Sequence, residues 1–135
     1  MVAKVPPKHA APPAPLVRAG EIVSIYLHSA RHDKFLICIC PQALKFISIN
    51  SAAWPMDPAA QLQVTPADFG FLTHTSFISV GQPIRLTTLE LNVLTTAPQR
   101  RLGVITAQMA TKIKAAAAKS VTLTGVDKTL IDSNL

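Results

Sequence analysis

Short apolar runs separated by polar, glycine and proline positions make up most of the chain after residue 19. Residues 20–27 (GEIVSIYL) alternate polar and apolar side chains, which is typical of a strand that enters a core. Residues 34–40 (KFLICIC) are almost wholly apolar, as expected of a strand buried on both faces. Residues 44–51 (LKFISINS) predict a third strand that ends in a small polar pair.

The remaining strand-like segments are shorter and closely spaced. The pattern predicts strands over residues 62–66, 76–80 and 84–94, with a proline-containing loop over 52–60 and a turn at residues 80–83. Several short strands with glycine and proline turns are typical of a small antiparallel barrel.

Residues 99–120 predict one closing helix, because the segment is rich in alanine and long side chains. Apolar residues recur at spacings of three and four and form one stripe: Leu102, Ile105, Met109, Ile113 and Ala116. A polar stripe borders it: Arg101, Gln108, Lys112 and Lys119. No acidic residue lies between Glu90 and Asp127, so we expect this positive charge to be available to an outside partner.

Length and composition predict one domain with tails. The chain has 135 residues, 49% of them hydrophobic, which is enough to bury a core. Residues 1–18, rich in proline and alanine, predict a disordered basic arm, residues 19–123 a barrel domain with its closing helix, and residues 124–135 a C-terminal tail. No segment has the roughly 18 uninterrupted apolar residues of a membrane span, and prolines interrupt the N-terminus, so a cytoplasmic protein is expected.

The net charge of +6 favours an anionic partner such as nucleic acid or an acidic protein segment, although it could also serve solubility alone. Cys38 and Cys40 are the only cysteines. Two residues apart on a predicted strand, they should face the same side and make a poor disulfide, so we expect buried free thiols. No cofactor is expected, and no metal, because further ligands at suitable spacing are lacking.

The densest group of candidate chemical residues is the polar loop 28–33 and the residue after it: His28, Arg31, His32 and Lys34. Imidazole transfers protons near neutral pH, and the cations can bind phosphate. Asp33 could instead pair with Arg31 or Lys34, which would make this a solvated loop. Ser51 can cap a strand end or contact phosphate, and His74 is expected only to shape a turn.

Three segments carry a family likeness: Gly20–Val23 at the start of the first strand, the buried strand 34–40, and a segment with Leu72, Ser76, Gln82 and Arg85. In this order they resemble the MazF/PemK family of toxins from type II toxin–antitoxin systems, over about residues 19–120. The resemblance implies a mainly β fold with a C-terminal helix, built as a small SH3-like antiparallel barrel and usually dimeric. It also implies cleavage of single-stranded RNA without a metal, and inhibition by a cognate antitoxin.

The implied reaction is attack of a ribose 2′-hydroxyl on its neighbouring phosphate, which needs a base, an acid and cations. The resemblance and the polar loop together give the catalytic candidates Arg31, His32, Lys34 and Ser51. The candidates for binding RNA or a partner are His28, Gln82, Arg85, Arg101, Lys112 and Lys119. Some family members place their acid and base where this chain has Ser79 and Gly81, neither of which transfers protons.

Two other interpretations remain open from the sequence. The chain could be a catalytically silent barrel that binds nucleic acid or an acidic protein through the basic stripe and the N-terminal arm. It could also be a protein-interaction module that docks a partner helix against the barrel.

Overall fold

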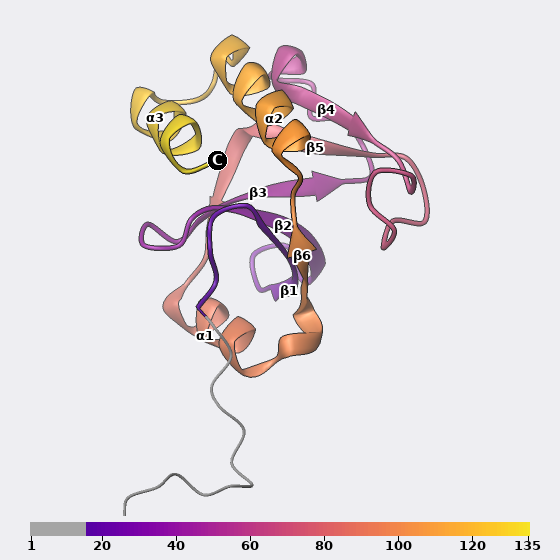
Figure 1. Cartoon of the computed structure of the whole chain (residues 1–135), viewed down its shortest axis with the longest axis vertical. Coiled ribbons are helices and arrows are strands. Elements are labelled where there is room, and N and C mark those ends of the chain that lie inside the picture. Colours follow the sequence, from indigo (N-terminus) through magenta and orange to yellow (C-terminus); the bar gives the residue numbers. More distant parts are fainter. Residues whose placement is uncertain (1–15) are drawn as a thin grey trace, which may run out of the picture.

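The computed structural model describes residues 16–135 and places six strands and three α-helices in that range (Figure 1). The strands are β1 (Glu21–Leu27), β2 (His32–Cys40), β3 (Lys45–Asn50), β4 (Gln61–Val64), β5 (Ser76–Arg85) and β6 (Arg101–Val104). The helices are α1 (Thr88–Thr96), α2 (Ala107–Lys119) and α3 (Gly125–Asn134), with short 3₁₀ turns η1 (Pro58–Ala60) and η2 (Pro98–Arg100). Most of the basic arm expected over residues 1–18 lies outside the described residues.

The strands form one antiparallel sheet in the order β4-β5-β3-β2-β1-β6. The sheet curls, and β4 and β6 are its edges, so it does not close among the described strands (Figure 1). The structure thus confirms a mainly β fold with a curled antiparallel sheet and a C-terminal helix. Within residues 16–135, no helix is long and apolar enough to cross a membrane.

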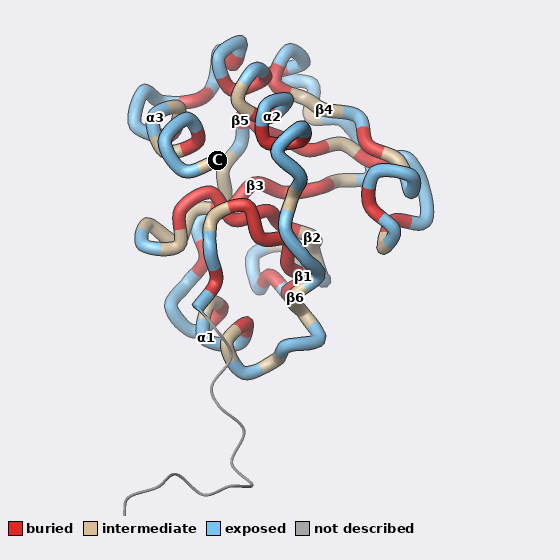
Figure 2. Tube along the Cα trace, viewed as in Figure 1, coloured by how far each residue is buried: buried red, intermediate tan, exposed pale blue. Residues whose placement is uncertain are grey.

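Each face of the sheet has its own apolar core. The larger core joins the strands to α2 and α3, and its fully buried members include Ile37, Ile47, Ile78, Ile113 and Ile131. The smaller core lies against α1 on the other face and includes Val23, Leu36, Phe46 and Leu94. The buried trace therefore follows the central strands, while the helices are exposed on their outer sides (Figure 2). Burial on both faces is why β2 reads as a nearly continuous apolar run.

The helix predicted over residues 99–120 is correct only from Ala107 onward. Its first part forms η2 and β6, and β6 pairs with β1. Gly103 has a φ of +138°, which no helix contains. The helix starts where the Thr106 side chain accepts a hydrogen bond from the Met109 N–H at 3.1 Å.

The strand predicted over residues 84–94 is wrong beyond Arg85, where α1 follows. Thr87 and Glu90 form a reciprocal capping box: the Glu90 N–H donates to Thr87 Oγ1 at 3.1 Å, and the Thr87 N–H donates to Glu90 Oε1 at 2.9 Å. Residues 124–135, expected as a tail, also contain a helix, α3, which Thr124 caps.

The turn predicted at residues 80–83 is not a chain reversal, because β5 runs through it. Ser79 lies opposite Ser48, and Ile84 lies opposite Phe46, so β5 pairs with β3 on both sides of an irregular bulge. Gly81 lies in the bulge, where a Cβ would come within 2.3 Å of Asp57 Oδ2. Glycine is therefore required here by close contact.

Asp57 is fully buried and joins the loop before β4 to the segment between α2 and α3. It accepts hydrogen bonds from the hydroxyls of Ser120 and Thr122, the latter at 2.6 Å, and from the N–H of Val121 at 3.3 Å. Burial by itself raises the pKa of this carboxyl, but the hydrogen bonds outweigh it and hold the pKa below its usual value.

Cys38 and Cys40 are buried and free, as predicted. The prediction that they face the same side is wrong, because the register of β2 against β3 shifts between them. Cys38 belongs to the smaller core and Cys40 to the larger one. Burial, assisted by Cys40 and Glu21, raises the pKa of Cys38 to about 12, so this thiol stays protonated.

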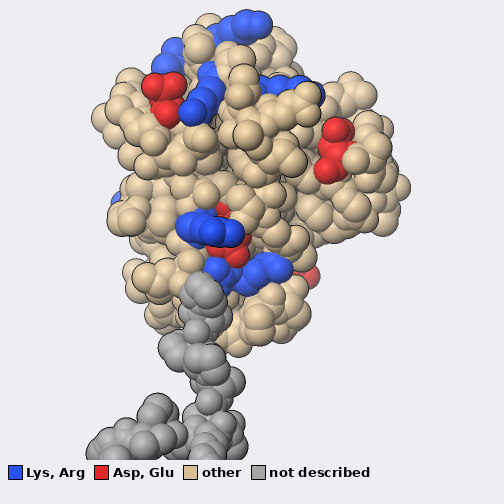
Figure 3. Space-filling model, viewed as in Figure 1, with Lys and Arg blue, Asp and Glu red and all other residues tan. Residues whose placement is uncertain are grey.

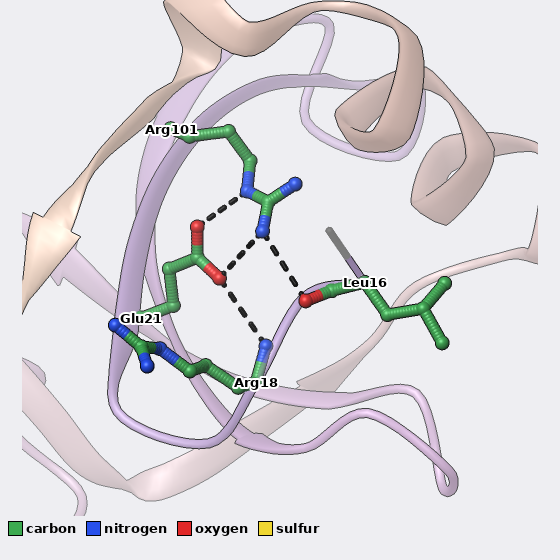
Figure 4. A network of polar contacts seen from close by, with 4 residues as sticks. All are labelled: Leu16, Arg18, Glu21 and Arg101. Carbon is green, nitrogen blue, oxygen red and sulfur yellow. Dashed lines mark hydrogen bonds and ion pairs between the residues drawn. The ribbon is translucent and has the colours of Figure 1, made fainter. Parts of the chain in front are cut away.

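A buried ion pair connects the start of β1 to the start of β6 (Figure 4). Arg101 donates through Nε to one carboxylate oxygen of Glu21 and through Nη2 to the other, at 2.9 Å. The Arg18 N–H also donates to Glu21, at 3.2 Å, and Arg101 donates to the Leu16 carbonyl at 3.3 Å. The pair therefore ties the incoming chain and both strands together, and the Glu21 carboxylate raises the pKa of Arg101.

Replacing Glu21 by alanine should lower the free energy of unfolding by about 3 kcal/mol, because it leaves the partly buried Arg101 guanidinium without its carboxylate partner. Asp33→Ala is the matched control, since it breaks an exposed ion pair with Arg100 and should cost less than about 1 kcal/mol. Urea unfolding measures both. Equal losses in the two variants would contradict a special role for the buried pair.

Replacing Asp57 by asparagine should cost about 2–3 kcal/mol near neutral pH, because hydrogen bonds to a charged acceptor are lost. The pKa of Asp57 is depressed in the folded state, so its contribution is present above the unfolded pKa of about 4 and is lost as the pH falls further. The difference between wild type and Asp57→Asn should therefore shrink on acidification. Urea titrations across this pH range test the trend, and a constant difference would contradict it.

Candidate functional site

A polar pocket lies where β2 begins, β3 ends and β5 begins, with residues 71–74 as a further wall. We call it the strand-end pocket; its volume is about 430 Å³. The polar side chains that line it are His32, Asp33, Lys34, Asn50, Ser51, Thr73, His74 and Ser76. Antiparallel pairing explains the meeting of β2 and β3: Phe35 lies opposite Ile49, so the residues on either side, Lys34 and Asn50, become neighbours.

Each histidine of the pocket contacts the backbone carbonyl of the next residue through Nδ1. His32 Nδ1 lies 2.7 Å from the Asp33 carbonyl oxygen, and His74 Nδ1 lies 2.9 Å from the Thr75 carbonyl oxygen. Because a carbonyl only accepts, we assign the proton to Nδ1 in both neutral rings. Each Nε2 then carries a lone pair, so either imidazole can act as a base, or as an acid once protonated.

Lys34 reaches the pocket from one end of a polar network inside the sheet. Its ammonium donates to Asn50 Oδ1, and Asn50 Nδ2 donates to Ser48 Oγ at 3.0 Å and Ser79 Oγ at 2.9 Å. Ser79 in turn donates to Gln61 Oε1 at 3.4 Å. Burial lowers the pKa of Lys34, so this ammonium releases a proton more readily than an exposed lysine does.

Lys34 forms no ion pair with a carboxylate in the described part of the chain, although Asp33 is its neighbour in sequence. The Asp33 carboxylate pairs with Arg100 at 3.3 Å, and not with Arg31 or Lys34 as one sequence interpretation allowed. Among residues 16–135, the other ion pairs are Lys45 with Asp127 and Arg101 with Glu21. The strand-end pocket therefore holds the Lys34 ammonium and two imidazoles, together with the Asp33 carboxylate that Arg100 binds.

The pocket brings together three of the four catalytic candidates, His32, Lys34 and Ser51. Arg31 is exposed in the preceding turn, with a φ of 60°, and does not line it. His28 also lies outside, with its ring 5.3 Å from that of Tyr26.

The remaining binding candidates lie elsewhere. Gln82 and Arg85 are exposed in the second half of β5, whereas the pocket contains the first residue of that strand. Arg101 is not available to a partner, because Glu21 already binds it. Lys112 and Lys119 are exposed on α2, and Figure 3 shows basic side chains gathered over α2 and α3.

Ser79 and Gly81 have structural roles. Ser79 is fully buried in the polar network, and Gly81 makes room for the Asp57 carboxylate. Neither position opens into the strand-end pocket, so a larger ionisable side chain there would disturb the sheet.

His74 and Asn50 are the pocket residues that sequence reasoning missed. His74 is distant from His32 along the chain, and only the folding of residues 71–74 against the strand ends brings it to the same cavity. The sequence indicated only that Asn50 ends a strand. Its contact with Lys34 depends on the register between β2 and β3, which the sequence does not show.

No group of three or more His, Cys, Asp and Glu side chains that could hold a metal ion occurs in the described part of the chain. No protein-family model matches the sequence, and a search of the curated proteins finds no match. The fold and the pocket therefore define the class of protein: a mainly β protein with a curled antiparallel sheet and a polar pocket at its strand ends that contains two histidines and a lysine.

Proposed function

We propose that this protein is an endoribonuclease of the MazF/PemK type, which cleaves single-stranded RNA at the strand-end pocket without a metal. The observation that carries the proposal is that one cavity contains two histidines, each bound through Nδ1 to a backbone carbonyl, and a lysine whose neighbouring carboxylate, Asp33, is paired with Arg100 instead. The curled antiparallel sheet is compatible with the small SH3-like barrel of that family. A homodimer and a cognate antitoxin belong to the same proposal.

The proposed step needs no group beyond this pocket and the RNA. One histidine accepts the proton of a ribose 2′-hydroxyl as its oxygen forms a bond to the adjacent phosphorus. The other histidine, protonated, gives a proton to the leaving 5′-oxygen as the P–O5′ bond breaks. The products are a 2′,3′-cyclic phosphate and a 5′-hydroxyl.

Lys34 is positioned to stabilise the charge that develops on the phosphate oxygens. Its ammonium has three N–H donors, and one is held by Asn50, which leaves two for the substrate. Ser51, exposed at the rim, supplies a further hydroxyl donor. His32 and His74 thus take the acid and base roles that some members of the family place at the positions of Ser79 and Gly81.

A second candidate function is a catalytically silent barrel that binds RNA. The exposed residues Gln108, Lys112 and Lys119 on one side of α2 favour it. Unlike the endoribonuclease, such a protein would bind RNA in a salt-sensitive way without forming cleavage products.

Purified protein should cleave a mixed-sequence single-stranded RNA in the presence of EDTA and leave 2′,3′-cyclic phosphate ends. His32→Ala and His74→Ala should each lower the cleavage rate by about 10²- to 10⁴-fold, because each removes a proton-transfer group. His28→Ala is the matched control and should cleave at the wild-type rate. Gel electrophoresis and end-group analysis of the products measure these effects.

Two results would contradict the proposal. One is the absence of cleavage by correctly folded wild-type protein. The other is cleavage that persists unchanged in both histidine variants, which would indicate a contaminating nuclease.

A further inference from the structure

A second cavity, the β6–α2 groove, lies between β6 and the first turns of α2, with residues 67–71 as its third wall. Its volume is about 370 Å³, within the usual range of small-molecule sites. Gly103 lines it from β6, and Gln108 and Lys112 line it from α2. A Cβ at Gly103 would meet no atom within 4 Å, so this part of the wall is accessible backbone.

Phe71 connects the groove to the strand-end pocket, because this residue lines both cavities. Its ring is stacked on Phe69, with centroids 5.4 Å apart and planes at 18°, and its centroid is 4.6 Å from that of Phe35. The half-buried ring is thus held in place by two neighbours. Fixed aromatic rings beside cationic grooves are the surfaces on which bases of single-stranded nucleic acids stack.

The groove is lined by one lysine without an ion-pair partner among the described residues, Lys112, and by one hydrogen-bonded carboxylate, Asp68. Lys112 is exposed and takes part in none of the ion pairs of residues 16–135. Asp68 also lines the groove, and its Oδ2 accepts hydrogen bonds from Thr65, from the N–H at 2.8 Å and the hydroxyl at 3.3 Å. A phosphate would therefore bind on the α2 side, and the base would lie toward Phe71 and Asp68.

We infer that the β6–α2 groove is a second RNA subsite. It takes the next nucleotide of the strand, beyond the two that flank the phosphate in the strand-end pocket. Phe71 stacks a base between the two cavities, and Lys112 with Gln108 contacts the sugar-phosphate backbone. The inference rests on the proposed function, to which it adds the path of the RNA across the molecule.

RNA fits these features better than an acidic peptide does. Lys112 would attract either ligand, but a peptide of acidic residues has no aromatic ring to stack on the ring of Phe71. The two adjoining cavities each contain one lysine, Lys34 in the pocket and Lys112 in the groove, which also matches a ligand that carries charge at regular intervals.

The test compares the binding of fluorescein-labelled 2′-O-methyl diuridylate and pentauridylate by fluorescence anisotropy. These probes lack the attacking hydroxyl and stay intact. Lys112→Ala should weaken pentauridylate binding about tenfold and leave diuridylate binding unchanged, because only the longer strand reaches the groove. The slope of log K against log salt should fall by about 0.7 for one lost phosphate contact. Phe71→Leu should weaken both probes, and the pentauridylate more strongly, because Phe71 lines both cavities.

Lys114→Ala is the matched control, because Lys114 is on the same helix but lines the cavity between α2 and α3. It should bind both probes as wild type does. Lys34→Ala should weaken both probes, since both occupy the strand-end pocket. Circular dichroism checks that each variant is folded. If Phe71→Leu does not fold, Lys112→Ala still tests the groove, because Lys112 is exposed and its replacement should not disturb the fold.

The outcomes separate the two proposals. If Lys34→Ala weakens both probes but Lys112→Ala weakens neither, the groove is not a subsite, while RNA binding at the pocket stands. If Lys34→Ala changes neither probe, the proposed function fails. Equal weakening by Lys112→Ala and Lys114→Ala would overturn the subsite in favour of general charge attraction. If Lys112→Ala loses binding to a labelled oligoglutamate but keeps its binding to RNA, the groove is a site for an acidic protein.

Discussion

The buried ion pair between Glu21 and Arg101 is the interaction on which the arrangement of the chain depends. It joins residues 80 positions apart and also binds the backbone of the segment that enters β1. A buried pair adds little net stability over apolar residues of similar size, but either partner alone is strongly unfavourable. It therefore selects the structure in which β6 lies beside β1. Because α2 begins directly after β6, the same contact determines where the β6–α2 groove forms.

The sheet face that carries the smaller core is divided between apolar and polar residues. Under α1 it is apolar, whereas toward β4 it holds the hydrogen-bonded network of Ser48, Asn50, Ser79 and Gln61. A buried network of this kind is tolerated because its members satisfy one another, and no described buried side-chain polar atom lacks a partner. The network ends at Lys34, so the polar interior of the sheet and the strand-end pocket are one continuous structure.

The candidate site was partly predictable. The polar loop and the strand after it showed a local concentration of histidine and cationic residues, and His32 and Lys34 do line the pocket. Arg31 belonged to the same concentration but does not line the pocket, because it lies in the turn before β2, where its positive φ breaks the alternation of the strand. His74 gave no local signal, since its place in the pocket depends on how residues 71–74 fold back on the strand ends.

The sequence by itself determined β1, β2 and β3, the buried thiols and α2 from Ala107 onward, because each follows from a local period of apolar residues. It also contained the capping box of Thr87 and Glu90, which marks the start of α1. Only the tertiary structure decided that residues 101–104 form a strand and that Arg101 is bound to Glu21. Helix propensities differ by less than about 1 kcal/mol per residue. Pairing with β1 and the burial of one ion pair therefore outweigh the helical pattern of that short segment.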